Sequence, residues 1–170
     1  GAASGLGRAF FSYLVKIRKN IILIDKDLEA LKKIKNAYPD IKIVGCDLST
    51  PKEIDTLLNN ELSNEYISEL YLCAGIGSKG LVRDLGFDAQ SKIVELNFLS
   101  RLKLALFSYN SMRINQLGRI VFVSSSTAFQ PMPFMAIYSA QNSALLSLGR
   151  AWSQESRRDG VNIHTLCPGG

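Results

Sequence analysis

Short apolar runs alternate with segments of helical periodicity along the chain, and this alternation constrains the fold more than any other feature. It is typical of βαβ units, in which helices join parallel strands and cover the sheet. Strands are expected at 21–25, 41–44, 69–73, 119–123 and 161–166, and helices at 6–17, 27–37, 51–60, 88–115 and 137–158. With 170 residues, the chain is long enough for one buried core. The sequence therefore predicts a single α/β domain over residues 1–170.

The helix expected at 88–115, with Asp88 as its cap, is apolar around nearly its whole circumference. Its apolar residues include Ile93, Val94, Leu96, Phe98, Leu99, Leu102, Leu104, Ala105, Leu106 and Phe107. Because a surface helix keeps one polar face, this helix is expected to be buried on two sides. One side would meet the sheet and the other a partner subunit, which predicts a homodimer or homotetramer. Burial under further segments of the same chain is the alternative.

A glycine-rich turn opens the chain and reads Gly1-Ala2-Ala3-Ser4-Gly5-Leu6-Gly7. Helix N-termini expose unpaired N–H groups and the positive end of the helix dipole, so such a turn accepts pyrophosphate. Asp25 ends an apolar run 18 residues after Gly7, where a carboxylate can accept hydrogen bonds from an adenosine ribose. The same carboxylate would repel a 2′-phosphate. The pattern therefore favours NAD over NADP, although Lys26 follows directly.

Three polar residues gather around the last apolar strands and helix. Ser125 ends the strand expected at 119–123, and Tyr138 follows 13 residues later. Tyr138 and Asn142 are four residues apart and share one helix face, so both can point at one ligand. Residues 120–149 contain no charged side chain, but Pro131 and Pro133 exclude a continuous membrane-spanning helix. We therefore expect a buried strand, loop and helix around a site.

Charge and cysteine usage exclude several function classes. The net charge of +5 comes from dispersed Lys and Arg, so neither a nucleic-acid surface nor a membrane surface is expected. Cys46, Cys73 and Cys167 are odd in number and lack CxxC spacing, which favours a reducing, cytoplasmic compartment without disulfides or zinc. His164, the only histidine, is expected to pack in the core rather than to act in catalysis. No metal site is predicted.

These motifs, in this order, closely resemble the classical short-chain dehydrogenase/reductase family over essentially the whole chain. The matching segments are the glycine turn, Asp47-Leu48, Asn97, the Ser125–Tyr138 interval and Pro168-Gly169. The family's Asn-Ala-Gly motif appears as Cys73-Ala74-Gly75, with its first residue changed. The resemblance implies a three-layer, Rossmann-type doubly wound parallel sheet. It also implies a strand before Gly1 and a substrate-covering segment after Gly170, so the sequence is expected to be part of a longer protein.

The resemblance also implies roles for individual residues. Tyr138 would be the general acid/base, and Ser125 would hold the substrate oxygen, with Ser124 and Ser126 as alternatives. Asn97 would hold a proton-relay water. The cofactor-binding residues would be Gly1, Ser4, Gly5, Leu6, Gly7, Asp25, Asp47, Leu48, Ala74, Gly75, Tyr138, Pro168 and Gly169.

Position 142 departs from the family, which has a lysine there. That lysine bonds the nicotinamide ribose and lowers the pKa of the tyrosine towards neutrality. Asn142 can still bond ribose hydroxyls but carries no charge, and no Lys or Arg lies between residues 120 and 149 to replace it. The prediction is an NAD(P)-dependent oxidoreductase that interconverts a small alcohol and a carbonyl compound. The alternatives are a non-catalytic dinucleotide-binding homologue, an introduced substitution at position 142 and, least favoured, a methyltransferase-like Rossmann protein.

Overall fold

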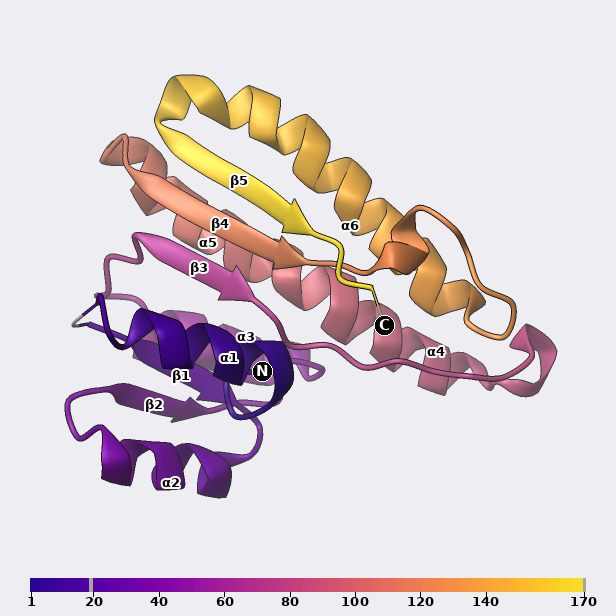
Figure 1. Ribbon diagram of the computed structural model, residues 1–170, viewed down its shortest axis with the longest axis horizontal. Coiled ribbons are helices and arrows are strands. Elements are labelled where there is room, and N and C mark those ends of the chain that lie inside the picture. Colours follow the sequence, from indigo (N-terminus) through magenta and orange to yellow (C-terminus); the bar gives the residue numbers. More distant parts are fainter. Residues whose placement is uncertain (19, 170) are drawn as a thin grey trace.

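The structure is a computed structural model that describes residues 1–18 and 20–169, and it contains the expected alternation of strands and helices (Figure 1). The strands are β1 (Ile22–Asp25), β2 (Lys42–Gly45), β3 (Glu69–Leu72), β4 (Gly118–Val123) and β5 (Val161–Leu166). The α-helices are α1 (Gly5–Leu14), α2 (Leu28–Ala37), α3 (Pro51–Thr56), α4 (Phe87–Val94), α5 (Ser100–Ile114) and α6 (Ala136–Glu155). Each lies within a few residues of its expected place.

All the strand pairs are parallel, as expected, but the described strands form two sheets. β1 pairs with β2, and β4 lies between β3 and β5. Gly1 and Ala2 lie beside β1, because both backbone nitrogens donate to the Ile24 carbonyl oxygen.

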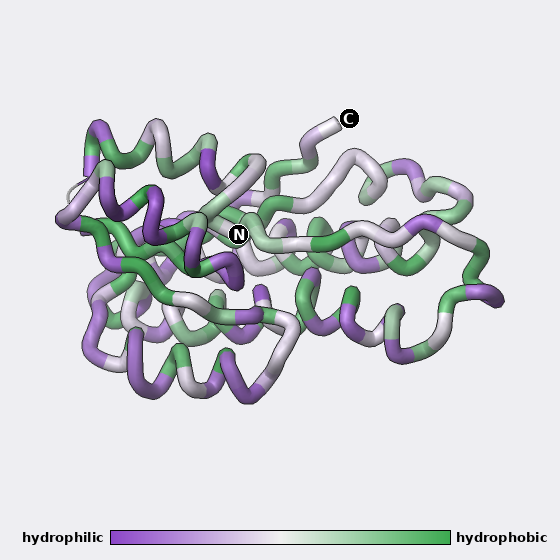
Figure 2. The backbone as a smooth tube through the Cα atoms, turned by 90° about the horizontal axis from the view of Figure 1, so that it is seen from below, coloured by the Kyte–Doolittle hydropathy of each residue, from purple (hydrophilic) through white to green (hydrophobic). Residues whose placement is uncertain are grey.

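The core has one part on each face of the sheets. Phe11 of α1 and Leu31 and Ile34 of α2 pack with Leu23 and Ile41. The larger part joins β3, β4 and β5 to α3, α5 and α6, with Leu72, Met112, Phe122, Leu145 and Ile163 among its members. Figure 1 shows α1 in front of the strands and α5 behind them. Figure 2 shows apolar stretches along the strands, whereas the helices alternate between polar and apolar turns. The three expected layers are therefore present.

The long helix has a different start and a different packing from those expected. Gly86, not Asp88, occupies the N-cap position, and α4 begins at Phe87. The helix continues as one π-helical segment, η3 (Glu95–Leu99), before α5. The sheet-facing side of α5 is partly polar and includes Ser100, Arg101 and Ser108, whereas Leu99 and Leu106 are exposed. The helix is buried towards the sheet, as expected, although polar side chains take part in that contact, and the contact with a partner subunit stays a prediction.

The position of His164 on β5 differs from the expectation. His164 is exposed on β5, so the expectation that it packs in the core is wrong. On β5 the buried side chains are Val161 and Ile163, and His164 falls on the opposite side because side chains alternate along a strand.

Within residues 1–18 and 20–169, no helix is both long and apolar enough to cross a membrane.

Candidate active site

The glycine turn packs too tightly for side chains. A Cβ atom built on Gly7 would lie 1.9 Å from the Gly1 carbonyl oxygen, and one built on Gly1 would lie 2.5 Å from the Ala74 nitrogen. Gly5 has a φ of +50°, in the left-handed region that favours glycine. The turn therefore brings the N-terminus of α1 against the backbone that follows β3, where free N–H groups can bind an anion.

A cavity of about 140 Å³ lies beside this turn, and we call it the Asp25 pocket. It is lined by Gly1, Ser4, Asp25, Lys26, Cys46, Asp47, Leu48, Ala74, Gly75, Ile76 and Leu96. Burial acts to raise the pKa of Asp25, but hydrogen bonds from the Asp27 and Ala3 N–H groups outweigh it and hold that pKa below its usual value. The N–H and hydroxyl of Ser49 lower the pKa of Asp47 in the same way. Both carboxylates are therefore ionised at neutral pH.

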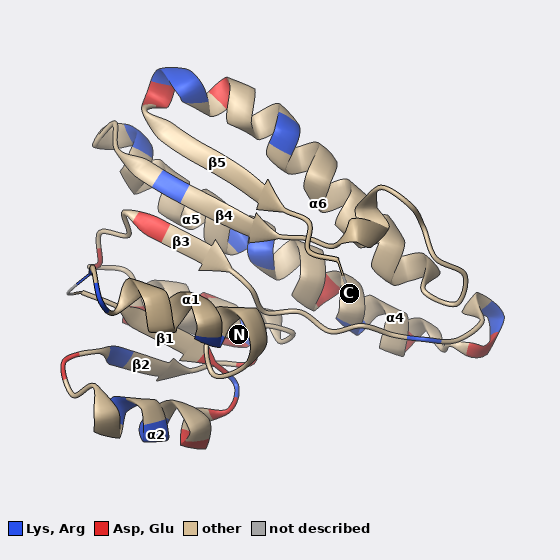
Figure 3. Cartoon of the chain, viewed as in Figure 1, with Lys and Arg blue, Asp and Glu red and all other residues tan. Residues whose placement is uncertain are grey.

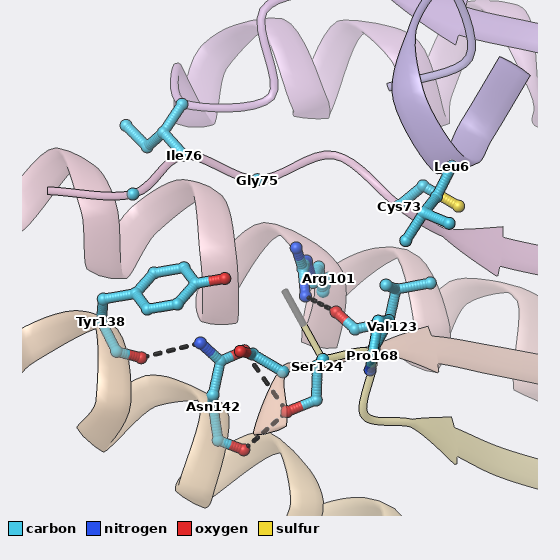
Figure 4. A pocket seen from close by; sticks show the side chains of 13 residues that line it. Leu6, Cys73, Gly75, Ile76, Arg101, Val123, Ser124, Tyr138, Asn142 and Pro168 are labelled. Carbon is cyan, nitrogen blue, oxygen red and sulfur yellow. Dashed lines mark hydrogen bonds between the residues drawn. The ribbon is translucent and has the colours of Figure 1, made fainter. Parts of the chain in front are cut away.

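A second cavity, of about 330 Å³, is lined by Ser125, Tyr138 and Asn142 of the expected catalytic residues, and we call it the Tyr138 pocket (Figure 4). Its lining is Leu6, Cys73, Gly75, Ile76, Gly77, Arg101, Val123, Ser124, Ser125, Tyr138, Asn142, Pro168 and Gly169. Gly75 and Ile76 line both pockets, so the two cavities share a wall. The structure thus gathers most of the predicted site residues. Gly5, Gly7 and Asn97 support the pockets without lining them.

The neighbouring serines have different hydrogen bonds. The buried Ser124 hydroxyl donates to the backbone oxygen of Asn142 over 3.0 Å, with the Asn142 Oδ1 atom 3.3 Å away. Ser125 Oγ instead accepts a hydrogen bond from the Thr127 N–H over 3.2 Å. A hydroxyl that accepts in this way keeps its own hydrogen for another partner. Ser125 can therefore donate into the pocket, whereas Ser124 connects β4 to α6.

Asn142 is held by the structure around it. It is 5% exposed, its Nδ2 atom donates to the Tyr138 carbonyl oxygen over 2.9 Å, and its Oδ1 atom faces the Ser124 hydroxyl. Figure 4 shows these contacts as dashed lines between α6 and the end of β4. A primary amide has two N–H hydrogens, so one remains for a ligand. Asn142 can therefore bind a ligand oxygen while it fixes the helix.

Asn97 fixes the wall that the two pockets share. Its Oδ1 atom accepts from the Ile76 N–H over 2.9 Å, and its Nδ2 atom donates to the Ile76 carbonyl oxygen over 2.7 Å. The residue is buried inside the π-helical segment η3, a type of distortion that is frequent at functional sites. Both side-chain atoms of Asn97 are thus engaged with Ile76, and the amide fixes the backbone at this residue.

Arg101 is the pocket residue that the sequence did not reveal. It is 5% exposed and lies one helical turn after Asn97. Its Nε and Nη2 atoms donate to the Ala74 carbonyl oxygen over 2.9 and 2.5 Å, and Nη1 donates to the Val123 carbonyl oxygen over 2.5 Å. Burial lowers the pKa of Arg101 to about 10. The guanidinium is still a cation at neutral pH. The four-residue spacing from Asn97 was the signal that could have found it.

Charges are otherwise rare around the Tyr138 pocket. Figure 3 shows Lys, Arg, Asp and Glu dispersed over the chain, with the loop after β4 and most of α6 uncoloured. Arg101 is the one charged residue in the lining of that pocket. Among the described residues, no group of three or more His, Cys, Asp or Glu side chains could hold a metal ion.

The family model for short chain dehydrogenases matches residues 1–170. The chain belongs to the short-chain dehydrogenase family. The proteins of this family are NAD(P)-dependent oxidoreductases with a Rossmann-type α/β fold.

Curated relatives and solved structures agree with this assignment. The chain is 29% identical to 3-oxoacyl-acyl-carrier-protein reductase FabG of Rickettsia prowazekii, covering 99% of this chain and 69% of the relative. It is 24% identical to the 7beta-hydroxysteroid dehydrogenase of Mediterraneibacter gnavus, covering 99% and 66%. A short-chain dehydrogenase from Sphingobium yanoikuyae in complex with NADPH superposes with a TM-score of 0.94 at 20% identity, covering 100% of this chain and 68% of that one. The chain thus spans about two thirds of the length of these proteins.

The residues present fit a nicotinamide dinucleotide. The glycine turn leaves its backbone open to a pyrophosphate, because side chains are sterically excluded at Gly1 and Gly7. The Asp25 pocket offers an ionised carboxylate to a ribose, and the Tyr138 pocket lies on the other side of Gly75. Two adjoining pockets beside one anion-binding turn suit the two halves of such a cofactor.

Proposed function

We propose that the protein interconverts an alcohol and a carbonyl compound by hydride transfer, with NAD as its cofactor. The observation that carries this proposal is that Tyr138 and Ser125 line one pocket, which shares the Gly75–Ile76 wall with the pocket that holds Asp25. A bound nicotinamide would accept or donate the hydride. The substrate would be a small molecule whose oxygen reaches both hydroxyl groups.

The roles of the two hydroxyl groups follow from their chemistry. Ser125 donates its hydroxyl hydrogen to the substrate oxygen and holds it, since Ser125 Oγ already accepts from Thr127. Tyr138 then removes the hydroxyl proton during oxidation, or donates one during reduction. Tyr138 lies in the first turn of α6, and the hydrogen bond from Asn142 Nδ2 to the Tyr138 carbonyl oxygen fixes its backbone there.

Turnover of a panel of primary alcohols, secondary alcohols and ketones with NAD(H) tests this proposal, with the full-length protein. Tyr138→Phe should abolish activity, because it removes the proton carrier and keeps the ring. Tyr13→Phe is the matched control, since Tyr13 is exposed on α1 and outside both pockets. Equal activity of Tyr138→Phe and wild type would contradict the proposal.

A non-catalytic dinucleotide-binding role is the second candidate. Its support is that Asn142 replaces the family lysine and that its amide is engaged with Ser124 and with the Tyr138 backbone. Under this alternative, NADH fluorescence titration would show binding, while the alcohol and ketone panel would show no turnover at any pH between 6 and 10.

We also propose that the exposed leucines of the long helix contact a second copy of the chain. Leu99 and Leu106 are 44% and 49% exposed. Leu106→Glu should therefore weaken a homodimer or homotetramer, measured by sedimentation of the full-length protein at micromolar concentration. Wild type that sediments as a monomer would contradict this part of the proposal.

A further inference from the structure

Arg101 is a buried cation without an acidic partner among the described residues. Its five N–H donors meet only two backbone carbonyl oxygens, those of Ala74 and Val123, and none of the ion pairs includes it. Burying a charge without a counter-charge is costly, and hydrogen bonds to neutral carbonyl groups offset only part of that cost. Arg101 therefore needs an explanation beyond the packing of α5.

The position of Arg101 suggests what that use is. Arg101, Tyr138 and Asn142 line the same pocket from α5 and α6. In Figure 4 the Tyr138 hydroxyl points towards the side of the pocket on which Arg101 lies. Space for the guanidinium depends on Gly75, because a Cβ built there would lie 2.5 Å from Arg101 Nη2. A cation thus lines the same pocket as the phenol.

We propose that Arg101 replaces the family lysine electrostatically, stabilising the phenolate of Tyr138 from α5 while Asn142 retains the ribose-binding and helix-fixing part of that role. Arg101 is a positioning residue that acts through Tyr138, and the inference rests on the proposed function. A guanidinium suits this position, because its planar set of donors can bind two carbonyl groups and still carry a full charge.

The charge interactions of Arg101 support this assignment. After burial, which lowers its pKa, the groups that act on Arg101 are the ionised forms of Cys73 and Tyr138, and both raise that pKa. Neighbouring elements carry other titratable groups, all outside the pocket lining. They are Glu69, Tyr71, Asp88, Lys92, Glu95, Lys103, Tyr109, Arg113, Arg119, Arg150, Glu155, Arg157, Arg158, Asp159 and His164.

Arg101 also compensates for a second departure from the family pattern. Cys73 stands where the family has asparagine, a residue that supports the ends of the strands. Here the guanidinium links Ala74, after β3, to Val123, at the end of β4. A structural role of this kind would exist even without any effect on Tyr138. The experiment must therefore separate the two roles.

The test compares Arg101→Gln, Arg101→Lys, Asn142→Lys and Arg101→Gln/Asn142→Lys in the full-length protein with bound NAD. Lys103→Gln is the matched control, since it removes an exposed cation from the same helix that pairs with Asp55. One readout is the pH dependence of kcat for alcohol oxidation. A second readout needs no turnover. It is the absorbance at 295 nm, which follows tyrosine ionisation as the pH rises, and the part of this signal that is lost in Tyr138→Phe belongs to Tyr138.

In Arg101→Gln, both titration midpoints should move to higher pH by about one unit or more, and kcat at pH 7 should fall about tenfold for each unit. Arg101→Lys should keep both midpoints within about half a unit, although its melting temperature falls, because lysine keeps the charge and loses the planar bridge. Asn142→Lys should lower the midpoints more in the Arg101→Gln background than in wild type. Two cations in one buried pocket depress each other's protonation, so the effects are not additive.

Each remaining outcome identifies which idea fails. If Arg101→Gln loses stability and leaves both midpoints unchanged, Arg101 is only a structural bridge and the inference is overturned. If wild type shows no turnover but the 295 nm midpoint moves in Arg101→Gln, the proposed oxidoreductase function fails and the inference stands. If Arg101→Gln does not fold, Arg101→Lys decides, because a rise of a full unit despite the retained charge would overturn the inference.

Discussion

The Asp25 pocket and the Tyr138 pocket share a wall but are built differently. The Asp25 pocket depends on backbone geometry, on Gly1 and Gly7 that exclude side chains, and on a carboxylate at a strand end. The Tyr138 pocket depends on side chains from six separate segments, and its cation comes from α5. The first follows the family pattern closely, whereas the second departs from it at Cys73 and Asn142. A pocket built from backbone tolerates little change, and one built from side chains can be rearranged by compensating substitutions.

The largest effect is expected from Gly7→Ala, which should weaken cofactor binding at the glycine turn beside the Asp25 pocket. The new Cβ would lie 1.9 Å from the Gly1 carbonyl oxygen, so the turn must move away from α1. We expect NADH binding to weaken about 1000-fold or more, which corresponds to about 4 kcal/mol, measured by fluorescence titration. Gly86→Ala is the control, because a Cβ there meets nothing within 4 Å. Equal binding by the two variants would show that the turn is not the anion site.

The next largest effect should separate two adjacent serines in the side-chain-built half. Ser125→Ala should lower kcat about 100-fold with an unchanged melting temperature, because one donor to the reacting oxygen is lost. Ser124→Ala should instead cost about 1–2 kcal/mol of stability, since it leaves the Asn142 oxygen atoms without their partner. A reversed result, with activity lost only in Ser124→Ala, would move the substrate-binding role to Ser124.

A smaller effect concerns the choice of cofactor. Asp25→Asn should raise the affinity for NADPH relative to NADH about tenfold, since the carboxylate no longer repels a 2′-phosphate and Lys26 remains in the pocket. Titration of both reduced cofactors against wild type and variant measures this ratio. Wild type that already binds NADPH more tightly would show that Lys26 dominates over Asp25. Asp27→Asn, outside both pockets, is the control.

The smallest effect is electrostatic. Ser49 lowers the pKa of Asp47 below its usual 3.8, so this interaction contributes stability above that pH and loses it as the pH falls through the folded-state pKa. Ser49→Ala should therefore cost less than about 1 kcal/mol at pH 7, and the difference from wild type should vanish in stronger acid. Urea unfolding at pH 7 and at pH 2.5 measures both values. A difference that persists in acid would assign the loss to packing.

The sequence predicted those parts of the fold that depend on local backbone signals. The strands, the helices and the glycine turn lie within a few residues of their expected positions because periodicity and glycine spacing specify them locally. The expected start of α4 was wrong. An acidic residue suits both the N-cap and the first turn of a helix, and here Gly86 occupies the N-cap while Asp88 lies in the first turn. The expectation for His164 was wrong because it rested on the expected strand alone, which does not determine the side of the strand on which a residue lies.

The site was predictable to a similar degree and for a similar reason. The residues that line the pockets from strand ends and the glycine turn follow from motifs with fixed spacing. Arg101 was missed because it is a single polar residue in an apolar helix, and only the packing of α5 against β3 and β4 shows that its side chain turns inward. The 13-residue spacing favoured Ser125 over Ser124, whereas the different hydrogen bonds of the two serines became visible only in the structure.

The bond pair between Asn97 and Ile76 has a consequence for the thermodynamics of cofactor binding. Two hydrogen bonds clamp the segment that forms a wall of both pockets. That segment is already ordered, so a ligand that spans both cavities does not have to immobilise it. Ordering a flexible loop would otherwise consume part of the interaction energy. The distance between the Asp25 pocket and the Tyr138 pocket is thus set during folding. The two hydrogen bonds of Asn97 therefore favour ligands whose two halves are separated by that distance, as in a dinucleotide.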